Sequence, residues 1–204
     1  MNRPLPPEMS NLDIEFQPDQ DGLGAWARDN FIEPGSPLTN PDHEHLQYAT
    51  IGWLWANTAA EFRGKRFAGE ARMLKPAPAK WSSLMAEQQM RGWFDGGLPD
   101  FLIVLDAEYA QTAPDDAFCA LVEHELYHCG QDIDLFGAPR FKDDGSPAFA
   151  MKAHDVEQFV GVVERYGAAA AGVQEMVDAA KRGPIVQDGA VSAACGTCSK
   201  RRAA

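Results

Sequence analysis

Two histidines and a glutamate lie close together in the segment EHELYHC, residues 123–129. His124 and His128 are four positions apart, so in an α-helix their imidazoles lie on one face and can reach the same metal ion. Zinc accepts two such nitrogens, and a catalytic zinc site adds a third protein ligand and an open position for water. Glu125 directly follows the first histidine and can take a proton from zinc-bound water. The segment therefore predicts a zinc site with a catalytic base.

The competing interpretation is a solvated helix face that carries the same residues by chance, and the neighbouring sequence decides between the two. Thr112 can cap a helix, and it is followed by a proline and two aspartates, which favour a first turn. The apolar run FLIVL at 101–105 precedes this helix and is typical of a buried strand. Gly130 follows as a stop signal. We therefore expect a helix of about 16–18 residues, with the motif in its last two turns.

A third ligand has to come from elsewhere in a chain that has five histidines. His154 follows after a long loop, which could deliver it to the metal. His43 and His45 compete, but with a spacing of two they cannot share one helix face, and next to an acidic helix start we expect them to be solvated. Asp155 and Glu157 are the carboxylate alternatives, either as ligands or as partners that orient an imidazole N–H. The favoured metal ligands are His124, His128 and His154.

The elements before the motif do not alternate regularly. Residues 40–64 carry apolar side chains at helical spacing, which predicts one long helix. Residues 65–75 predict a strand with Gly69 as a bulge. A short helix is expected near 82–92, and a strand over 101–110. This order predicts an α+β fold rather than a series of βαβ units.

Two helices are predicted after the loop at 131–153. The first has Asp155 and Gln158 in an arrangement typical of a capping box. Its apolar stripe is expected to face the core and consists of Val156, Phe159, Val160 and Val163. The second helix is rich in alanine and ends at Gly183.

Changes in composition divide the chain into three parts. Six of the 14 prolines lie in residues 1–40, which predicts an extended N-terminal arm over 1–39 with Trp26 and Phe31 as anchors. Residues 40–183 are predicted to form one domain, and 184–204 a flexible tail. The tail contains CGTC, which is half a zinc site, a redox dithiol or an incidental pair of cysteines, and we favour the last.

The composition limits the classes of protein to consider. Hydrophobic residues make up 45% of the 204 residues, enough for a buried core, and the net charge is -12. Such an acidic chain repels phosphate backbones, so a nucleic-acid partner is not expected. No apolar stretch is long enough to span a membrane, so we predict a cytoplasmic protein. Four cysteines are too few for a disulfide scaffold, and Cys129, which projects away from His128, is interpreted as a core residue.

The segment ALVEHELYHC, followed by a loop and HDVEQFVGVVERYG, resembles the phage metallopeptidases, zincin-type domains of bacteriophage and prophage genomes. HEHLQYATIGWLW and PDFLIVLD resemble the same family, so the resemblance covers about residues 40–168. HExxH with HDVEQF is more distantly similar to SprT/Spartan-like proteases. The resemblance implies a zincin-like fold, with His124, His128 and His154 as zinc ligands and Glu125 as catalytic base. The basic DNA-binding elements of those distant relatives are not expected in this acidic chain.

The predicted activity is zinc-dependent hydrolysis of a protein or peptide substrate, with Zn2+ as cofactor and Glu125 as general base. Tyr127 and Tyr166 are candidates for stabilising an oxyanion, and Asp155 and Glu157 for orienting a ligand. The alternative is a non-catalytic, zincin-shaped protein-binding module of phage or prophage origin. A DNA-associated protease is a weaker third interpretation, because the net charge counts against it.

Overall fold

The computed structural model describes residues 2–10, 13–62, 64–76, 78–187 and 190–191. The helices and small mixed sheets make an α+β fold, as the sequence predicts. The chain forms two compact units, which are Met1–Lys152 with Asp188–Ala204, and Ala153–Gln187. Among the described helices, none is both long and apolar enough to cross a membrane.

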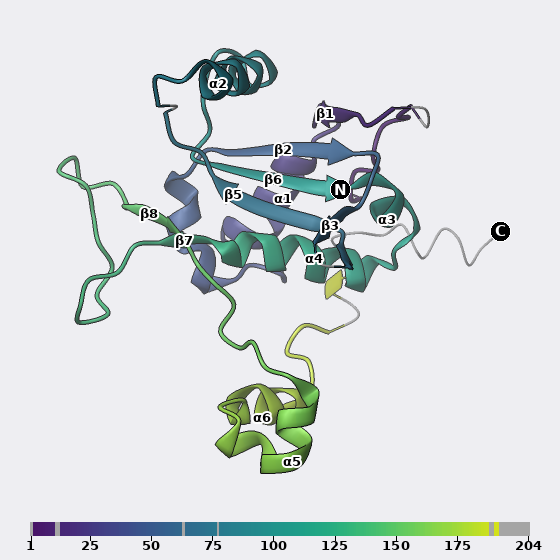
Figure 1. The fold of residues 1–204 in the computed structure, drawn as a ribbon, viewed down its shortest axis with the longest axis vertical. Helices are drawn as coiled ribbons and strands as arrows, with labels where there is room; N and C mark the ends of the chain where they lie inside the picture. The colour runs from purple at the N-terminus through teal and green to yellow at the C-terminus, as the bar shows by residue number, and fades with distance from the viewer. Residues whose placement is uncertain (1, 11–12, 63, 77, 188–189, 192–204) are drawn as a thin grey trace. The chain divides into compact units, whose positions relative to one another are not determined.

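The first unit is built on a four-stranded sheet (Figure 1). Its order is β1 (Phe16–Pro18), β2 (Ile51–Ala56), β6 (Phe101–Asp106) and β5 (Gly69–Met73). The two central strands, β2 and β6, are parallel, whereas β1 and β5 pair antiparallel to their neighbours. The central strands are buried and almost wholly apolar, which is typical of strands covered on both faces. This leaves β5 as an end strand of the sheet.

The long helix predicted over residues 40–64 is wrong. This stretch contains a short 3-10 helix, η2 (Pro41–Tyr48), then β2, and then the strand β3 (Ala60–Phe62). The sequence IGWLWA buries Trp53 and Trp55 on one face of the sheet and Leu54 on the other. All six residues of β2 pair in register with β6, so the sheet satisfies the backbone groups that a helix would have bonded internally. Burial on both faces hid the alternation that would have identified the strand.

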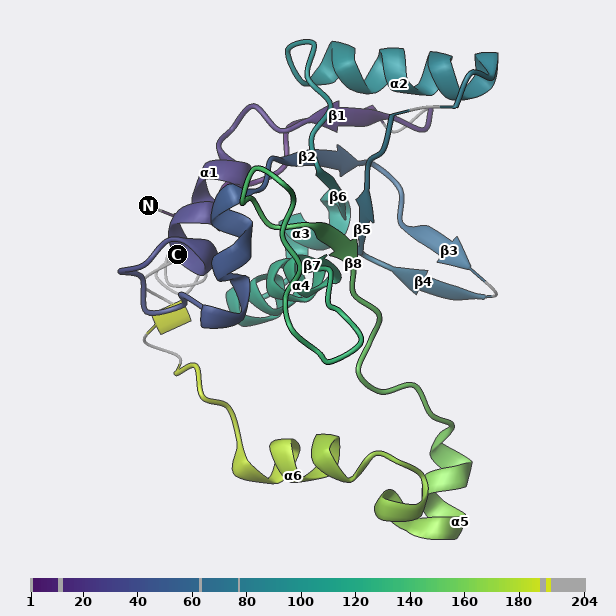
Figure 2. The same ribbon diagram turned by 90° about the vertical axis from the view of Figure 1, so that its left-hand side faces the viewer.

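Helices cover the sheet face that carries the two tryptophans. α1 (Leu23–Ala27), the π-helical turn η1 (Arg28–Ile32) and α4 (Asp115–His128) contribute to one core cluster with this face, and Figure 2 shows α1 and α4 on the same side of the sheet. Trp26 and Phe31 are buried, so the residues predicted to anchor the N-terminal arm do lie in the core, within helical rather than extended chain.

The helix predicted near residues 82–92 is confirmed as α2 (Trp81–Trp93). The residue that follows it packs against the opposite face of the sheet. A Cβ atom added to Gly52 of β2 would lie 2.6 Å from the ring of Phe94, the residue that directly follows α2. Only a glycine therefore allows this ring to approach the strand so closely.

The elements before the motif differ from the predicted ones at their ends. The predicted strand 65–75 is split into β4 (Lys65–Phe67), which pairs with β3, and β5 in the main sheet. β6 ends at Asp106, because this side chain accepts hydrogen bonds from the backbone of the next residues and caps α3 (Ala107–Thr112). Thr112 ends α3 instead of capping α4, and its hydroxyl donates to the carbonyl of Glu108. α4 therefore begins later than predicted and has 14 residues.

A small hairpin follows α4 where the sequence predicts a loop. It consists of β7 (Cys129–Gln131) and β8 (Phe149–Met151). α4 ends at His128, just before Gly130, as the sequence predicts, but Gly130 is a strand residue and does not have the positive φ of a helix-capping glycine. A Cβ atom there would lie 3.2 Å from the carbonyl oxygen of Ala150, so the close approach of the two strands uses the glycine.

The second unit contains α5 (Val160–Ala170) and α6 (Gln174–Arg182). Asp155 does not cap a helix, because α5 begins five residues later without a side-chain cap, and the Gln158 amide donates to Ala171 instead. The predicted core stripe is also wrong, since Phe159 is 81% and Val160 is 72% exposed. The predicted division into arm, domain and tail stays a prediction, and CGTC lies outside the described residues.

Candidate metal centre

The two histidines of the motif lie in the last turns of α4 with their imidazoles directed at each other. Their Nε2 atoms are 3.3 Å apart, and their ring centroids are 4.9 Å apart with the planes at 84°. His124 is exposed and His128 is half-buried. Two nitrogens bound to one tetrahedral zinc ion at about 2.0–2.1 Å lie roughly 3.3 Å apart. The pair therefore has the spacing that two ligands of a single metal ion require.

The backbone after the hairpin holds His128 in place. Nδ1 of His128 lies 2.7 Å from the carbonyl oxygen of Lys152, and the Lys152 N–H donates to the His128 carbonyl oxygen at 2.9 Å. Because a carbonyl can only accept, Nδ1 must carry the proton, and the neutral ring then presents an unprotonated Nε2 towards His124. Metal-binding histidines are commonly oriented by such a bond from their other nitrogen.

The Glu125 side chain is buried in the protein. Its side chain is 3% exposed and lies against Gly69, the first residue of the end strand β5. A Cβ atom at Gly69 would lie 2.5 Å from Oε1 of Glu125, a separation that real Cβ atoms do not tolerate. The strand thus approaches the carboxylate closely because residue 69 has no side chain. α4 places Glu125 between the histidine-bearing face and the end strand of the sheet.

The remaining predicted site residues belong to the second unit. His154 is exposed, and its Nδ1 lies 3.3 Å from Oε1 of Glu157. Asp155 is exposed. Tyr166 lies in α5 and is 64% exposed. The roles predicted for His154, Asp155, Glu157 and Tyr166 stay predictions.

Tyr127 connects α4 to η2 through its hydroxyl. The amide of Asn40 donates to the Tyr127 oxygen at 2.8 Å, and the hydroxyl donates to Asp42 at 3.0 Å. The same amide donates to Glu123 at 2.7 Å. Burial is the largest cause that raises the pKa of Glu123 and of Tyr127. This network holds η2 against the C-terminal half of α4, so Tyr127 has a structural role whether or not it also acts on an oxyanion.

Cys129 is a core residue, as the sequence predicts. Its side chain is fully buried, and the thiol donates to the Glu125 carbonyl oxygen at 3.4 Å. Burial, and then the nearby Glu125, raise the pKa of the Cys129 thiol to about 12. A neutral thiol is a poor metal ligand, because metals bind the thiolate. Cys129 therefore does not compete with the histidines for a metal.

The sequence model of a protein family, described as "Putative phage metallopeptidase", matches residues 24–181. The chain belongs to this phage metallopeptidase family. Membership suggests a peptidase and implies a metal ion, and the match spans both the paired histidines of α4 and His154. Comparisons with curated proteins and with solved structures found no match.

Sequence reasoning predicted the wrong environment for His43. His43 is expected to be solvated, yet its side chain is completely buried in η2, and its ring lies edge-on to Tyr127 with 4.7 Å between the centroids. Desolvation by burial lowers the pKa of His43 to about 4. The neighbouring His45 is half-buried, and its Nε2 lies 2.7 Å from the carbonyl oxygen of Cys129. No pattern in the sequence distinguishes these two environments, because they depend on where η2 packs.

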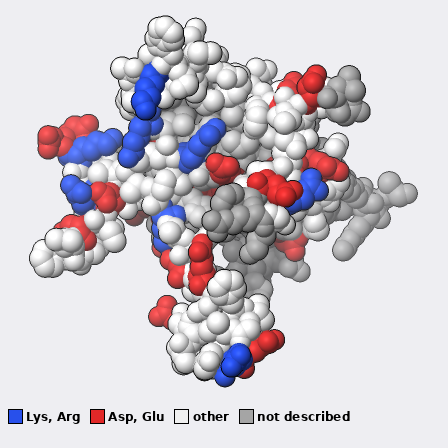
Figure 3. All heavy atoms as spheres, viewed as in Figure 1, with Lys and Arg blue, Asp and Glu red and all other residues white. Residues whose placement is uncertain are grey.

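The charge of the surface is mixed on the face shown in Figure 3, where acidic and basic side chains both occur among the described residues. The net charge of -12 therefore does not produce a uniformly acidic surface on this face.

Proposed function

We propose that the protein is a zinc-dependent peptidase whose metal is held by the two histidines of α4. The observation that carries the proposal is the 3.3 Å separation of their Nε2 atoms, together with the 2.7 Å contact from His128 Nδ1 to the Lys152 carbonyl. The separation matches two ligands of one tetrahedral ion, and the contact selects the tautomer that can bind it. Membership in a metallopeptidase family supports the same conclusion.

His154 is the third ligand in this proposal. It follows Lys152 by two residues, so the length of the chain keeps the two Cα atoms within about 7 Å of each other. Lys152 in turn contacts His128. Glu157 lies beside Nδ1 of His154, which favours Nε2 as the nitrogen that binds metal. The residues that match the family model include His124, His128 and His154.

Glu125 is the general base of the proposed reaction. A bound zinc ion would polarise the scissile carbonyl and lower the pKa of a water molecule. Glu125 would take the proton from that water and pass it to the leaving amine. The end strand β5 lies directly beside this carboxylate at Gly69, and the backbone of an end strand can pair with an extended peptide. A substrate along β5 would therefore lie next to the base.

The test combines metal analysis with a protease assay on intact wild type and on Glu125→Gln. We expect both proteins to bind one equivalent of zinc, because Glu125 is not a ligand. Wild type should cleave peptides, whereas the variant should lose activity by roughly 10²–10⁴-fold, the usual contribution of a positioned base. Full activity of Glu125→Gln would refute the mechanism. Wild type that binds stoichiometric zinc but cleaves nothing in a diverse peptide mixture would favour the non-catalytic binding module.

A further inference from the structure

The strand β5 has one open edge (Figure 1). It pairs with β6 on one side, and none of the described strands pairs with its other side. Ala68 and Leu74, which flank β5, are hydrogen-bonded to the chain at the two ends of β6. Because every second residue of an antiparallel strand bonds to the same neighbour, the backbone groups of Ala71 and Met73 are directed towards the open edge. An extended peptide can pair with these groups.

Two opposite charges lie side by side on the outer face of β5. Ala71 and Met73 pack against the core cluster to which α4 contributes. Glu70 and Arg72 alternate with them along the strand and therefore lie on the other face of the sheet. Both side chains are exposed, and within the described part of the chain neither takes part in an ion pair. The two charges thus face solvent two positions apart.

The neighbours of these two charges inside the sheet are apolar. Glu70 is opposite Val104 of β6, and Arg72 is opposite Leu102. Opposite charges at facing positions stabilise paired strands, and like charges destabilise them. A strand that pairs with the open edge would provide the charged partners that β6 lacks. It would need a basic residue opposite Glu70 and an acidic residue opposite Arg72.

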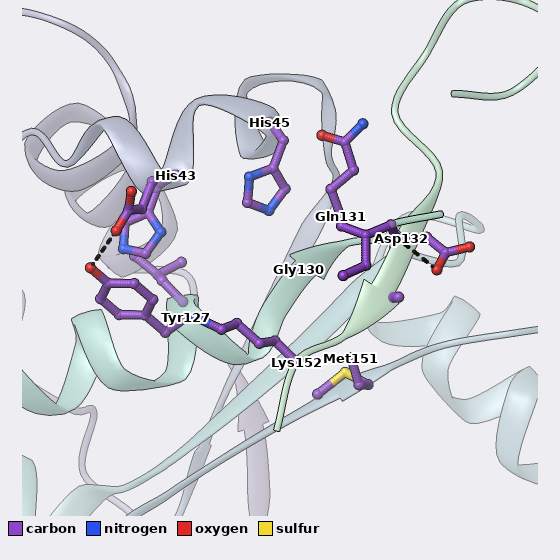
Figure 4. A pocket seen from close by; sticks show the side chains of 12 residues that line it. His43, His45, Tyr127, Gly130, Gln131, Asp132, Met151 and Lys152 are labelled. Carbon is purple, nitrogen blue, oxygen red and sulfur yellow. Dashed lines mark hydrogen bonds between the residues drawn. The ribbon is translucent and has the colours of Figure 1, made fainter. Parts of the chain in front are cut away.

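The outer face of β5 also has room for long side chains. Glu70 and Arg72 border a cavity of about 180 Å³ whose apolar walls include Phe16 and Phe67. Such walls suit the aliphatic parts of charged side chains. A second cavity of about 530 Å³ is lined by residues of η2, of the end of α4 and of the β7–β8 hairpin (Figure 4), and none of its lining residues belongs to β5. The charge pair therefore has a cavity of its own.

We propose that β5 selects extended peptides in which an acidic residue is followed, two positions further on, by a basic residue. Antiparallel pairing is expected, because it is the more stable arrangement and both end strands of this sheet use it. The acidic residue then faces Arg72, the middle residue bonds to Ala71, and the basic residue faces Glu70. The residue after it faces Gly69, which lies beside Glu125. Glu70 and Arg72 are thus specificity-determining residues.

This assignment rests on the proposed peptidase function, because it names the substrate class of the same site. Two blocked heptapeptides of equal composition test it: acetyl-Ala-Ala-Glu-Ala-Lys-Ala-Ala-amide and acetyl-Ala-Ala-Lys-Ala-Glu-Ala-Ala-amide. Each is titrated into metal-free, isotope-labelled, full-length protein, and the amide signals of Ala71 and Met73 are followed by NMR. Binding in the absence of metal needs no hydrolysis. The two peptides have the same net charge, so unspecific attraction is equal for both.

The first peptide should bind with a Kd about tenfold lower than that of the second, because two favourable charge pairs replace two repulsive ones. Its binding should shift the amide signals of Ala71 and Met73 saturably. Equal Kd values, tighter binding of the second peptide, or binding that leaves these two signals unchanged would overturn the proposal.

An exchange of the two charges gives the sharpest variant. Glu70→Lys combined with Arg72→Glu keeps the net charge and should invert the preference, so that the second peptide binds more tightly. The matched control is Glu164→Lys with Arg165→Glu, which exchanges two exposed charges of α5 and should leave the preference unchanged. Glu70→Gln alone removes one charge and should reduce the preference to about threefold. A preference that survives in the exchanged β5 variant contradicts the proposal.

Cleavage by the zinc-loaded protein separates this assignment from the peptidase function. We expect kcat/KM to be about tenfold higher for the first peptide, in line with its tighter binding. If the first peptide binds more tightly but neither peptide is cleaved, the peptidase function fails and the selective edge of β5 stands. If both peptides are cleaved equally fast, the peptidase function stands and the selection by Glu70 and Arg72 is overturned.

Discussion

The chain has two pairs of closely spaced histidines, and the structure gives them opposite environments. His124 and His128 lie on the outer side of α4, with 3.3 Å between their Nε2 atoms. His43 and His45 lie on the 3-10 helix η2, where one ring is buried without a hydrogen-bond partner among the described residues and the other contacts the Cys129 carbonyl. The first pair converges on one point, whereas the rings of the second pair have separate surroundings.

The difference shows that the spacing and the type of helix decide what two histidines can do together. A separation of four in an α-helix stacks two side chains on one face, so both can reach a metal. A separation of two directs the side chains apart, so each takes the environment of its own side of the helix. The first pair is suited to ligation, whereas in the second pair one ring is packed in the interior and the other supports the junction of α4 and β7.

The largest expected contrast between the pairs is in metal affinity. His124→Ala removes one of two converging nitrogens and should weaken zinc binding by at least 100-fold, since even partners that only orient a ligand contribute about 10–100-fold. His43→Phe should leave zinc affinity unchanged. Competition with a chelating dye measures both. Equal losses in the two variants would mean that the pair on η2 also binds the metal, and the distinction between the pairs would fail.

The next contrast is in stability against acid. The pKa of His43 is about 4 in the folded protein, below its ordinary value of 6.5. The unfolded chain therefore binds more protons between these values, and stability is full above pH 6.5 and falls as the pH approaches 4. At pH 5 the titration of His43 therefore lowers the free energy of unfolding by about 2 kcal/mol.

His43→Phe should remove this acid sensitivity. Denaturant unfolding of metal-free wild type and variant at pH 7 and pH 5 gives the comparison. Wild type should lose about 2 kcal/mol more than the variant between the two pH values. If both proteins lose the same free energy, His43 is not held neutral by burial.

Sequence reasoning was most successful where local chemistry decides the structure. The helix that carries His124 and the strand at 101–106 were predicted because an apolar run and helix-start signals lie next to each other in the chain. The α+β class followed from the order of such elements. The contact of Glu125 with Gly69 could not be predicted, because it depends on how β5 packs against α4.

Predictions failed where tertiary pairing overrode local pattern. The helix predicted over 40–64 failed because β2 is buried on both faces and its alternation is invisible in the sequence. The prediction that His43 is solvated failed for a related reason, since η2 is held by side chains far away in the chain, such as Tyr127. Polar residues near a helix start are usually solvated, and only the packed structure identifies the exception.

A smaller effect is expected at Gly69, which tests the buried side of α4 rather than its metal-binding side. Gly69→Ala places a Cβ atom 2.5 Å from Oε1 of Glu125, so the carboxylate has to move. We expect kcat to fall by roughly tenfold, about 1.4 kcal/mol, while zinc binding is kept. Gly92→Ala in α2 is the matched control, because a Cβ atom there meets nothing within 4 Å. Unchanged kcat in Gly69→Ala would show that the observed position of Glu125 is unimportant.

The smallest expected effect concerns His45, the supporting member of the second pair. Its Nε2 lies 2.7 Å from the Cys129 carbonyl oxygen, at the junction of α4 and β7. His45→Phe leaves this acceptor without its donor and should cost about 1 kcal/mol of unfolding free energy. His45→Gln carries a donor on a side chain of similar reach and should restore part of the loss. Because this bond does not involve the metal, the cost should be the same with and without zinc. A loss that appears only with zinc bound would instead make His45 part of the metal centre and end the contrast between the two pairs.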